Sequence, residues 1–347
     1  MSKNLKTLAL LTVLMVCMCA SVALAGSMDE VSELQAVFTN GGTAVLDGDI
    51  DVGEGTLTVA EGKTVTLDLN GYSIVGKKTT KATKNHEMIL ISKGASLTIR
   101  DSKGGGKITY EYTGATTNYS YYVNTISNAS GTLVVESGTI ENLTNVSSQI
   151  SYVIDTLTNG TRGDATTTIK GGVIKSPYYI AMRTFANSTT HTAKIVITGG
   201  TFTGRIQIHD SNAKANKSEL IISGGTFNAS TAASQSVYIY GHTDTSNLKV
   251  SVSDGVFNGT VQSVTAGGGE LVTGYISGGS YKYEPDEDLI KPGENVVLID
   301  GRYYLGDAIP AQPKLPKTGD NAHPALLAML LLSSVCALAL LRRRARA

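Results

Sequence analysis

IVITGGTF, residues 195–202, is the clearest of six segments that align with one another without gaps. The other five are LVVESGTI (133–140), TTIKGGVI (167–174), LIISGGTF (220–227), VSVSDGVF (250–257) and GYISGGSY (274–281). In each segment a β-branched residue stands three positions before a glycine, and a large apolar or aromatic residue stands two positions after it. Apolar residues alternate before the glycine, which predicts a strand with one buried face. Glycine adopts positive φ at little cost, so each segment predicts two short strands joined by a corner.

The regular return of this unit indicates the fold class. The corner glycines recur every 24 to 34 residues, at Gly138, Gly172, Gly200, Gly225, Gly255 and Gly279. Self-similarity at such a period is typical of a solenoid, in which successive turns stack their inward side chains in columns. The segments lack the leucine and asparagine consensus of leucine-rich repeats, and a propeller blade would need four strands in roughly 40 residues. The sequence therefore predicts an all-β protein that forms a parallel β-helix.

Two further segments, TVTLDLNGYSI (64–74) and SLTIRDSKGGGKI (96–108), extend the pattern upstream with less regular spacing. With the six repeats they resemble the single-stranded right-handed β-helix of pectate-lyase-like bacterial proteins. The resemblance covers roughly residues 29–281. It implies the fold and its handedness, and it does not specify an activity. Many proteins of this fold are polysaccharide lyases or hydrolases, so the resemblance keeps an enzyme among the alternatives.

Both ends of the expected solenoid carry a candidate cap. Residues 29–38, DEVSELQAVF, space their apolar residues as a helix does, so we expect a short helix that covers the N-terminal end. Residues 296–299 and 302–305 flank Asp300-Gly301, which is a strong signal for a C-terminal β-hairpin cap. The expected parts of the exported chain are a β-helix with its N-terminal cap (26–281), a C-terminal cap (282–309) and a wall spacer with the sorting motif (310–318).

The first 25 residues have the three parts of a secretory signal peptide. Lys3 and Lys6 precede an apolar run, and Ala23-Leu24-Ala25 is a small-x-small cleavage site. We therefore expect cleavage between Ala25 and Gly26, which removes residues 1–25 and exports the rest of the chain.

The other end contains the pentapeptide Leu315-Pro316-Lys317-Thr318-Gly319, an apolar run over residues 325–341 and a tail rich in arginine. These three parts, in this order, resemble the sorting signal of wall-anchored surface proteins of Gram-positive bacteria. The resemblance implies that a sortase cleaves after Thr318, removes residues 319–347 and joins Thr318 to peptidoglycan. The implied partners are the sortase and peptidoglycan, and the membrane is contacted only transiently through 325–341. The implied location is the outer face of the cell wall.

The composition narrows the function further. The 29 basic and 29 acidic residues balance, so the basic excess of a nucleic-acid binder is absent and no nucleic-acid partner is expected. All three cysteines lie in the two segments expected to be removed, so the mature protein would have no disulfide and no thiolate chemistry. Acidic residues between 113 and 253 are scattered along the chain. The sequence thus marks no catalytic residue, metal site or cofactor, although carboxylates from neighbouring turns could still meet in space.

Three strands that follow corners carry polar and aromatic residues in alternation with apolar ones. They read YYIAMRT (178–184), GRIQIHD (204–210) and SVYIYGHTD (236–244). Alternation directs the isoleucines inward and predicts one outward, solvent-accessible face with these residues: Tyr179, Arg183, Arg205, Gln207, His209, Tyr238, Tyr240 and His242. Aromatic rings beside hydrogen-bond donors suit the recognition of sugars or glycoproteins. An ordinary exposed sheet face rich in tyrosine has the same pattern, and a third metal ligand beside His209 and His242 is not evident.

Three classes of function therefore compete. The first is a wall-anchored surface protein that binds glycans or host or environmental proteins and so mediates adhesion. The second is a wall-anchored polysaccharide lyase or hydrolase, for which Arg183, Arg205, His209 and Asp210 would be the first residues to substitute. The third is a passive spacer. The scattered acids favour binding over catalysis, and the polar and aromatic face favours binding over a spacer.

Overall fold

The computed structural model describes residues 30–114, 121–145, 151–159, 161–209, 216–231, 233–241, 245–265 and 270–310. The chain divides into two compact units, Met1–Ile309 and Pro310–Ala347. The fold described below is that of the first unit.

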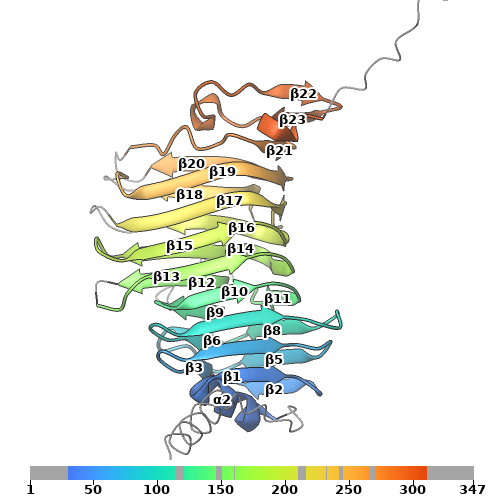
Figure 1. The fold of residues 1–347 in the computed structure, drawn as a ribbon, viewed down its shortest axis with the longest axis vertical. Coiled ribbons are helices and arrows are strands. Elements are labelled where there is room, and N and C mark those ends of the chain that lie inside the picture. The colour runs from blue at the N-terminus through green and yellow to red at the C-terminus, as the bar shows by residue number, and fades with distance from the viewer. Residues whose placement is uncertain are drawn as a thin grey trace, which may run out of the picture. The chain divides into compact units, whose positions relative to one another are not determined.

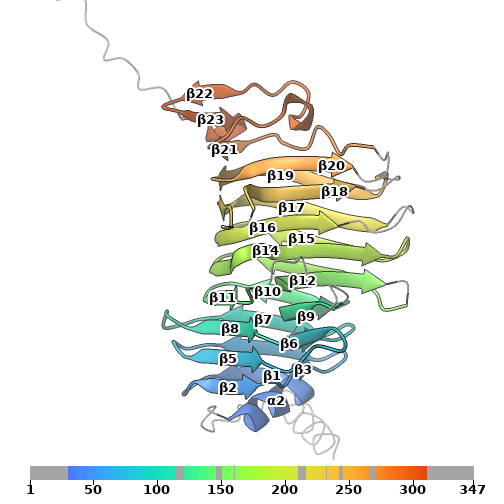
Figure 2. The same ribbon diagram turned by 180° about the vertical axis from the view of Figure 1, so that it is seen from behind.

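The first unit is a parallel β-solenoid of about seven turns. Each turn, here called a rung, contributes one strand to each of three faces, A, B and C. Strands of one face pair in parallel with the strands one rung before and after, as the all-β parallel prediction requires. Figures 1 and 2 show the strands stacked along the long axis of this unit.

Face A contains β1 (Gly42–Val45), β4 (Thr64–Asp68), β7 (Ser96–Arg100), β10 (Thr132–Val135), β13 (Ala165–Ile169), β15 (Thr192–Ile197) and the first parts of β17 (Lys217–Asn228) and β19 (Leu248–Phe257). Face B contains β2 (Ile50–Gly53), β5 (Ser73–Lys78), β8 (Lys107–Tyr112), β11 (Thr139–Asn142), the first parts of β14 (Val173–Asn187) and β16 (Thr201–His209), the last parts of β17 and β19, and β21 (Gly279–Tyr281). Face C contains β3 (Leu57–Val59), β6 (His86–Ile91), β9 (Val123–Ala129), β12 (Ser151–Asn159), the last parts of β14 and β16, β18 (Gln235–Gly241) and β20 (Thr260–Thr265).

The corners between faces A and B are made by the glycines that the sequence singled out. All six corner glycines have positive φ, from 82° at Gly172 to 138° at Gly255, a region that disfavours any residue with a Cβ. The glycine before the corner has a different reason to be there. A Cβ on Gly199 would lie 2.5 Å from the carbonyl oxygen of Lys170 in the previous rung, and one on Gly224 would lie 2.5 Å from that of Thr198. The first glycine therefore allows the rungs to approach, and the second turns the chain.

The core includes the two residue columns predicted around the corners. The β-branched column is fully buried in all six segments: Val135, Ile169, Ile197, Ile222, Val252 and Ile276. On face B, the rings of Phe202, Phe227, Phe257 and Tyr281 form a continuous stack. Their centroids are 4.9, 4.8 and 4.7 Å apart and neighbouring planes are tilted by only 6 to 7°. The repeat thus stabilises neighbouring rungs through identical contacts.

Both predicted caps are present. The helix α2 (Val31–Asn40) buries Leu34 and Phe38 and covers the first rung, two residues further along the chain than predicted. The turn Asp300-Gly301, with φ of 49° and 76°, joins β22 (Val297–Ile299) to β23 (Arg302–Leu305) in an antiparallel hairpin. Strand β23 also pairs antiparallel with β21, so the hairpin closes the last rung of face B. Two short 3-10 helices flank this region, η1 (Glu287–Leu289) and η2 (Gly306–Ala308).

Candidate functional site

The predicted outward residues gather on face C as expected from the strand register. Arg183 pairs with Gln207 of the next rung, and Gln207 pairs with Tyr238 of the rung after it. His209 pairs with Tyr240 in the same way. Their apolar neighbours, such as Ile206 and Ile239, are fully buried in the core. The structure describes neither the side chain of Tyr179 nor any part of His242 and Asp210, so these candidates lie outside the described side chains.

The predicted exposure of this face is wrong for three of its residues. Only 2% of Arg183, 5% of Arg205 and 3% of Gln207 is accessible to solvent. The covering groups are aromatic rings from other rungs, because the guanidinium carbon of Arg183 lies 4.4 Å from the ring centre of Tyr122 and 4.1 Å from that of Tyr152.

Two further rings complete this cover. Phe185 lies 4.9 Å from the guanidinium carbon of Arg183, and the Tyr238 ring lies 4.3 Å from that of Arg205. The alternation of residues in the sequence predicts on which side of the strand a side chain lies. Whether that side is exposed depends on the contacts with rings from elsewhere in the fold, which alternation does not predict.

A carboxylate neutralises the buried guanidinium of Arg183. Its Nε donates to Asp155 Oδ1 at 2.9 Å and its Nη2 donates to Asp155 Oδ2 at 2.6 Å, so the ion pair is bidentate. Its Nη1 donates to the hydroxyl of Tyr152 at 3.1 Å. Burial lowers the pKa of Arg183, but Asp155, Tyr152 and Tyr122 together outweigh burial and the net pKa is raised. Burial raises the pKa of Tyr152, which stays a neutral hydrogen-bond partner.

A row of half-buried rings runs along face C beside this ion pair. Phe185 lies 6.1 Å from His209, and His209 stacks on Tyr240 at 5.1 Å between ring centres. Tyr238 lies 6.3 Å from Tyr240. Gln207 Nε2 is 3.0 Å from His209 Nδ1, which fixes the orientation of that imidazole. Four aromatic residues from three successive rungs therefore form one surface, called here the ring row: Phe185, His209, Tyr238 and Tyr240.

The ring row borders a pocket of about 320 Å³. Phe185 belongs to both, and the other lining residues used below are Glu87, Leu90, Asn124, Asp155, Leu157 and Arg162. Asn124 Nδ2 donates to Ser127 Oγ at 3.0 Å and lies 3.4 Å from Asp155 Oδ2, whereas its buried Oδ1 has no hydrogen-bond partner. The pocket is therefore lined by carboxylates, side-chain amides, guanidinium groups, hydroxyls and apolar side chains.

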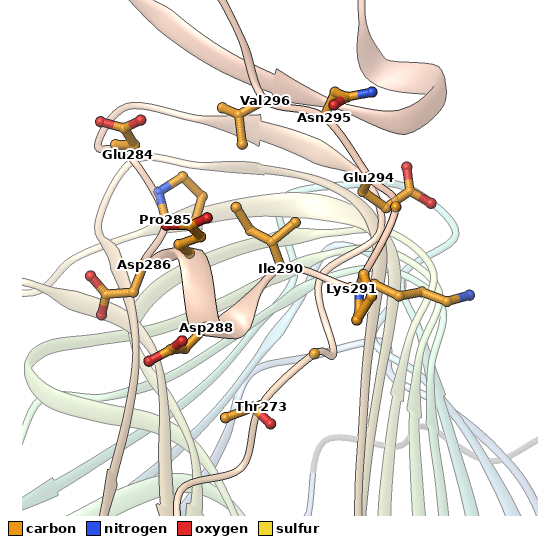
Figure 3. A pocket seen from close by; sticks show the side chains of 14 residues that line it. Thr273, Glu284, Pro285, Asp286, Asp288, Ile290, Lys291, Glu294, Asn295 and Val296 are labelled. Carbon is orange, nitrogen blue, oxygen red and sulfur yellow. The ribbon is translucent and has the colours of Figure 1, made fainter.

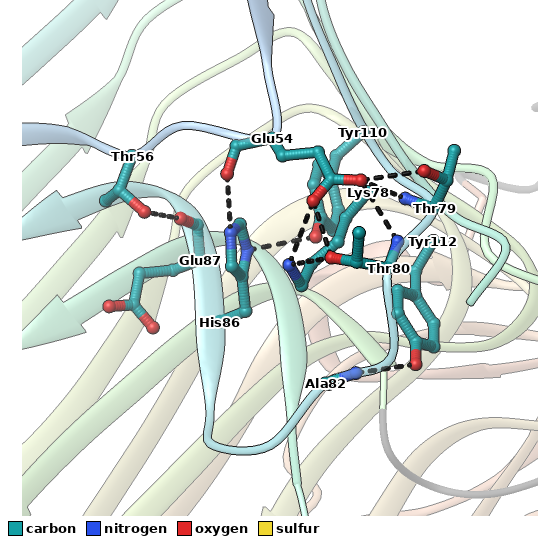
Figure 4. A network of polar contacts seen from close by, with 10 residues as sticks. All are labelled: Glu54, Thr56, Lys78, Thr79, Thr80, Ala82, His86, Glu87, Tyr110 and Tyr112. Carbon is teal, nitrogen blue, oxygen red and sulfur yellow. Dashed lines mark hydrogen bonds and ion pairs between the residues drawn. The ribbon is translucent and has the colours of Figure 1, made fainter. Parts of the chain in front are cut away.

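Glu87 lies at the boundary between this pocket and a second polar network. In Figure 4 its carboxylate points away from the network drawn around Glu54. No described side chain lies within hydrogen-bond or ion-pair distance of the Glu87 carboxylate, and only its backbone oxygen accepts a bond, from Thr56. Burial raises the pKa of Glu87, the positive charges of Lys84 and Arg162 lower it, the negative charge of Asp155 raises it, and the net pKa is raised. Among the residues that the structure describes, the carboxylate of this half-buried acid therefore has no hydrogen-bond or ion-pair partner.

The network beside it is structural. Glu54 accepts hydrogen bonds from the backbone amides and hydroxyls of Thr79 and Thr80, which lowers its pKa (Figure 4). His86 Nε2 lies 2.9 Å from the backbone oxygen of Glu54, and its Nδ1 lies 3.0 Å from the hydroxyl of Tyr110. These bonds join three rungs of the N-terminal part and leave no group free for a ligand.

A larger hollow of about 900 Å³ lies in the C-terminal cap (Figure 3). Glu284, Asp286 and Asp288 line one side of it, and Lys291 and Glu294 line the other. These side chains are exposed to solvent except that of Glu294, which is half-buried. Within the described ranges no group of three or more histidine, cysteine or acidic residues could hold a metal ion. We interpret the cap acids as solvated loop residues.

Sequence reasoning missed the acids and the amide of the face C pocket. Asp155 lies exactly one rung before Arg183 in the register, and Thr156 pairs likewise with Thr184. A signal was present in the sequence. An alignment of the two segments across rungs would have placed Asp155-Thr156 opposite Arg183-Thr184, and so an acid opposite a base. Glu87 had no such signal, because its distance from Asp155 depends on the register of two strand pairings, β6 with β9 and β9 with β12.

One comparison with known proteins identifies how the chain is displayed. Residues 310–346 match the family model of the LPXTG cell wall anchor motif. No curated protein and no solved structure matches the chain. In the part of the chain that the structure describes, no helix has the length and apolarity to cross a membrane, and the apolar run 325–341 lies outside that part. The protein is a sortase-anchored surface protein of a Gram-positive cell wall, and it displays a β-solenoid domain.

Proposed function

We propose that face C is a ligand-binding surface and that the anchored protein binds glycans or proteins outside the cell, as an adhesion protein does. The observation that carries this proposal is the continuity of the pocket with the ring row. Phe185 lines the pocket and also contacts His209, which stacks on Tyr240. A ligand could therefore insert one group in the pocket and lay the rest across the rings.

The support beneath this surface favours binding over a passive spacer. The Arg183–Asp155 ion pair is buried and holds Tyr152 by a hydrogen bond. Rigid elements that fix the contact groups before binding reduce the entropy lost on association. A spacer has no use for an unpaired half-buried acid such as Glu87, because burying a charge without a partner is unfavourable.

A second candidate is a polysaccharide-cleaving enzyme. Glu87 and Asp155 line one pocket, and the raised pKa of Glu87 suits a general acid. Against this, both oxygens of Asp155 accept hydrogen bonds from Arg183, so the carboxylate is already engaged and not free to act as a base or nucleophile. Binding therefore accounts for the arrangement better than hydrolysis does.

The test uses the full-length chain displayed on its cell wall and the same chain released by muramidase digestion. Both are applied to a glycan array and to immobilised extracellular-matrix proteins, with Tyr240→Ala and with Tyr283→Ala as a control. Tyr283 is 48% exposed and lies outside face C. We expect Tyr240→Ala to reduce binding and leave the melting temperature nearly unchanged, whereas Tyr283→Ala changes neither. A large loss of stability without loss of binding would favour the spacer, and release of shorter saccharides would favour the enzyme.

A further inference from the structure

We propose that the face C pocket is the seat of one neutral sugar residue, whose hydroxyl groups bind Glu87 and Asn124. This inference rests on the proposed function and deepens it, because it chooses a sugar over a protein loop as the inserted group. The pocket is formed by four successive rungs, with Glu87 on β6, Asn124 on β9, Asp155 on β12 and Phe185 on β14.

Two hydrogen-bond acceptors of the pocket have no donor among the described residues. The Glu87 carboxylate is half-buried and has no partner among the described residues. Asn124 is 2% exposed, its Nδ2 is used by Ser127 and Asp155, and its Oδ1 lacks a donor. Buried acceptors without donors are rare in folded proteins and call for a missing partner. The hydroxyls of a pyranose ring are donors of the kind that these acceptors lack.

The charged side chains of the pocket, two carboxylates and two guanidinium groups, balance, so they favour neither an acidic nor a cationic ligand. The Glu87 carboxylate would repel a uronate or a sulfate placed beside it, and the charge of Asp155 is already paired with Arg183. Arg183 is fully engaged by Asp155 and Tyr152, so it cannot balance the charge of Glu87. The remaining cation, Arg162, is exposed and would repel an ammonium group on the ligand. A neutral hydroxyl can donate to Glu87 and accept from Arg162, so it suits both.

The apolar lining and the size fit a single ring. Leu90, Leu157 and Phe185 are half-buried and offer surface against which the C–H face of a sugar can pack. A volume of about 320 Å³ lies at the lower end of the roughly 300–1,000 Å³ typical of small-molecule pockets. The pocket therefore accepts one terminal residue or branch, and the rest of the glycan would cross the ring row.

The experiment compares three groups of oligosaccharides on one array, with ends that are a neutral hexose, a hexuronic acid or a free hexosamine. The muramidase-released chain is applied as wild type, Glu87→Gln, Asn124→Ala and the control Glu136→Gln. Glu136 is an exposed acid paired with Lys170 outside the pocket. We expect neutral ends to be retained, Glu87→Gln and Asn124→Ala to weaken binding about tenfold through loss of a hydrogen bond, and Glu136→Gln to bind as wild type.

A measurement on the wild type alone guards against unfolded variants. Saturation-transfer NMR with methyl hexopyranosides and methyl hexuronides should show transfer to the neutral sugar and little to the acid. Preference for acidic or amino ends overturns the inference. Undiminished sugar binding by both pocket variants, with loss in Tyr240→Ala, also overturns it and leaves the proposed function standing. If the chain retains protein ligands but no sugar, the sugar inference is overturned and the proposed function stands. If it retains neither sugars nor proteins, the proposed function itself is contradicted.

Discussion

Arg183 and Asp155 face each other on neighbouring rungs of face C, with Nη2 of the arginine 2.6 Å from Oδ2 of the aspartate. Side-chain exposure is 2% for the arginine and 1% for the aspartate, so each charge depends on the other for its stability. The Tyr122, Tyr152 and Phe185 rings around the guanidinium add attraction through their negative π faces. This pair supports both the pocket and the ring row, and it is the residue pair of face C with the largest predicted effect on stability.

Replacement of Asp155 by alanine should destabilise the solenoid by about 3–5 kcal/mol, because it leaves the Arg183 charge buried without a partner. Chemical denaturation of the released chain measures this. The control is Glu136→Ala, which breaks the exposed pair with Lys170 and should cost about 0–1 kcal/mol. Equal losses in the two variants would contradict the buried-pair interpretation.

The phenylalanine stack of face B should be equally sensitive. Phe227 is fully buried between Phe202 and Phe257, so Phe227→Ala leaves a cavity and should cost about 3–5 kcal/mol. Phe227→Leu, which refills part of that volume, should cost less. Circular dichroism should show mostly β structure in the wild type, and a spectrum dominated by helix would be incompatible with the fold.

A single added methyl group should also disturb the spacing of the rungs. In Gly199→Ala the new Cβ would lie 2.5 Å from the Lys170 carbonyl oxygen, which is backbone and cannot move aside easily. Crowding of this kind typically costs about 1–3 kcal/mol. The comparison change Gly293→Ala meets no atom within 4 Å and places alanine at a φ of 95°, so it measures the cost of positive φ without crowding, a strain that Gly199 does not share. A melting temperature of Gly199→Ala equal to that of the wild type would contradict the close approach.

Stability should fall as the pH is lowered through the range just below 6.5, because of His86. Burial lowers the pKa of His86 from its ordinary value of 6.5, so the folded state binds this proton less readily than the unfolded chain. The stabilising contribution is present above pH 6.5 and is lost between that value and the lowered folded pKa. The melting temperatures of the wild type and His86→Gln, measured from pH 7.5 to 5, should therefore converge on acidification. Parallel curves would show that His86 does not titrate in this range.

The anchoring residue is a prediction that mass spectrometry can check. After muramidase digestion, the C-terminal peptide should end at Thr318 and carry a peptidoglycan fragment. Boiling detergent should leave the protein on the wall, whereas deletion of 315–319 should release it to the membrane or the medium. Extraction of the intact wild type by detergent alone would contradict covalent anchoring.

The repeated corners were predictable because their cause is local. A glycine pair between a β-branched residue and a large apolar one fixes both the turn and the inward columns, and both are present. The C-terminal hairpin was predictable for the same reason, since Asp300-Gly301 specifies its own turn. The right-handedness implied by the family resemblance stays a prediction.

The candidate site was only partly predictable because its cause is not local. Register brought His209, Tyr238 and Tyr240 together as expected. The burial of Arg183 depends on Tyr152, which is 31 residues away in the chain and one rung away in space. A register shift between Ile180 and Met182 also interrupts the simple alternation that the prediction assumed.

The aromatic stack of face B has a mechanical consequence for a tethered protein. A ligand held on face C and a covalent bond near the C-terminus would put the intervening rungs under tension in flow. Those are the rungs that Phe202, Phe227, Phe257 and Tyr281 join ring by ring. The hairpin beyond them is joined to β21 by only three residue pairs. Unfolding under force should therefore start at the C-terminal hairpin, and face C should still bind its ligand after the hairpin has unfolded.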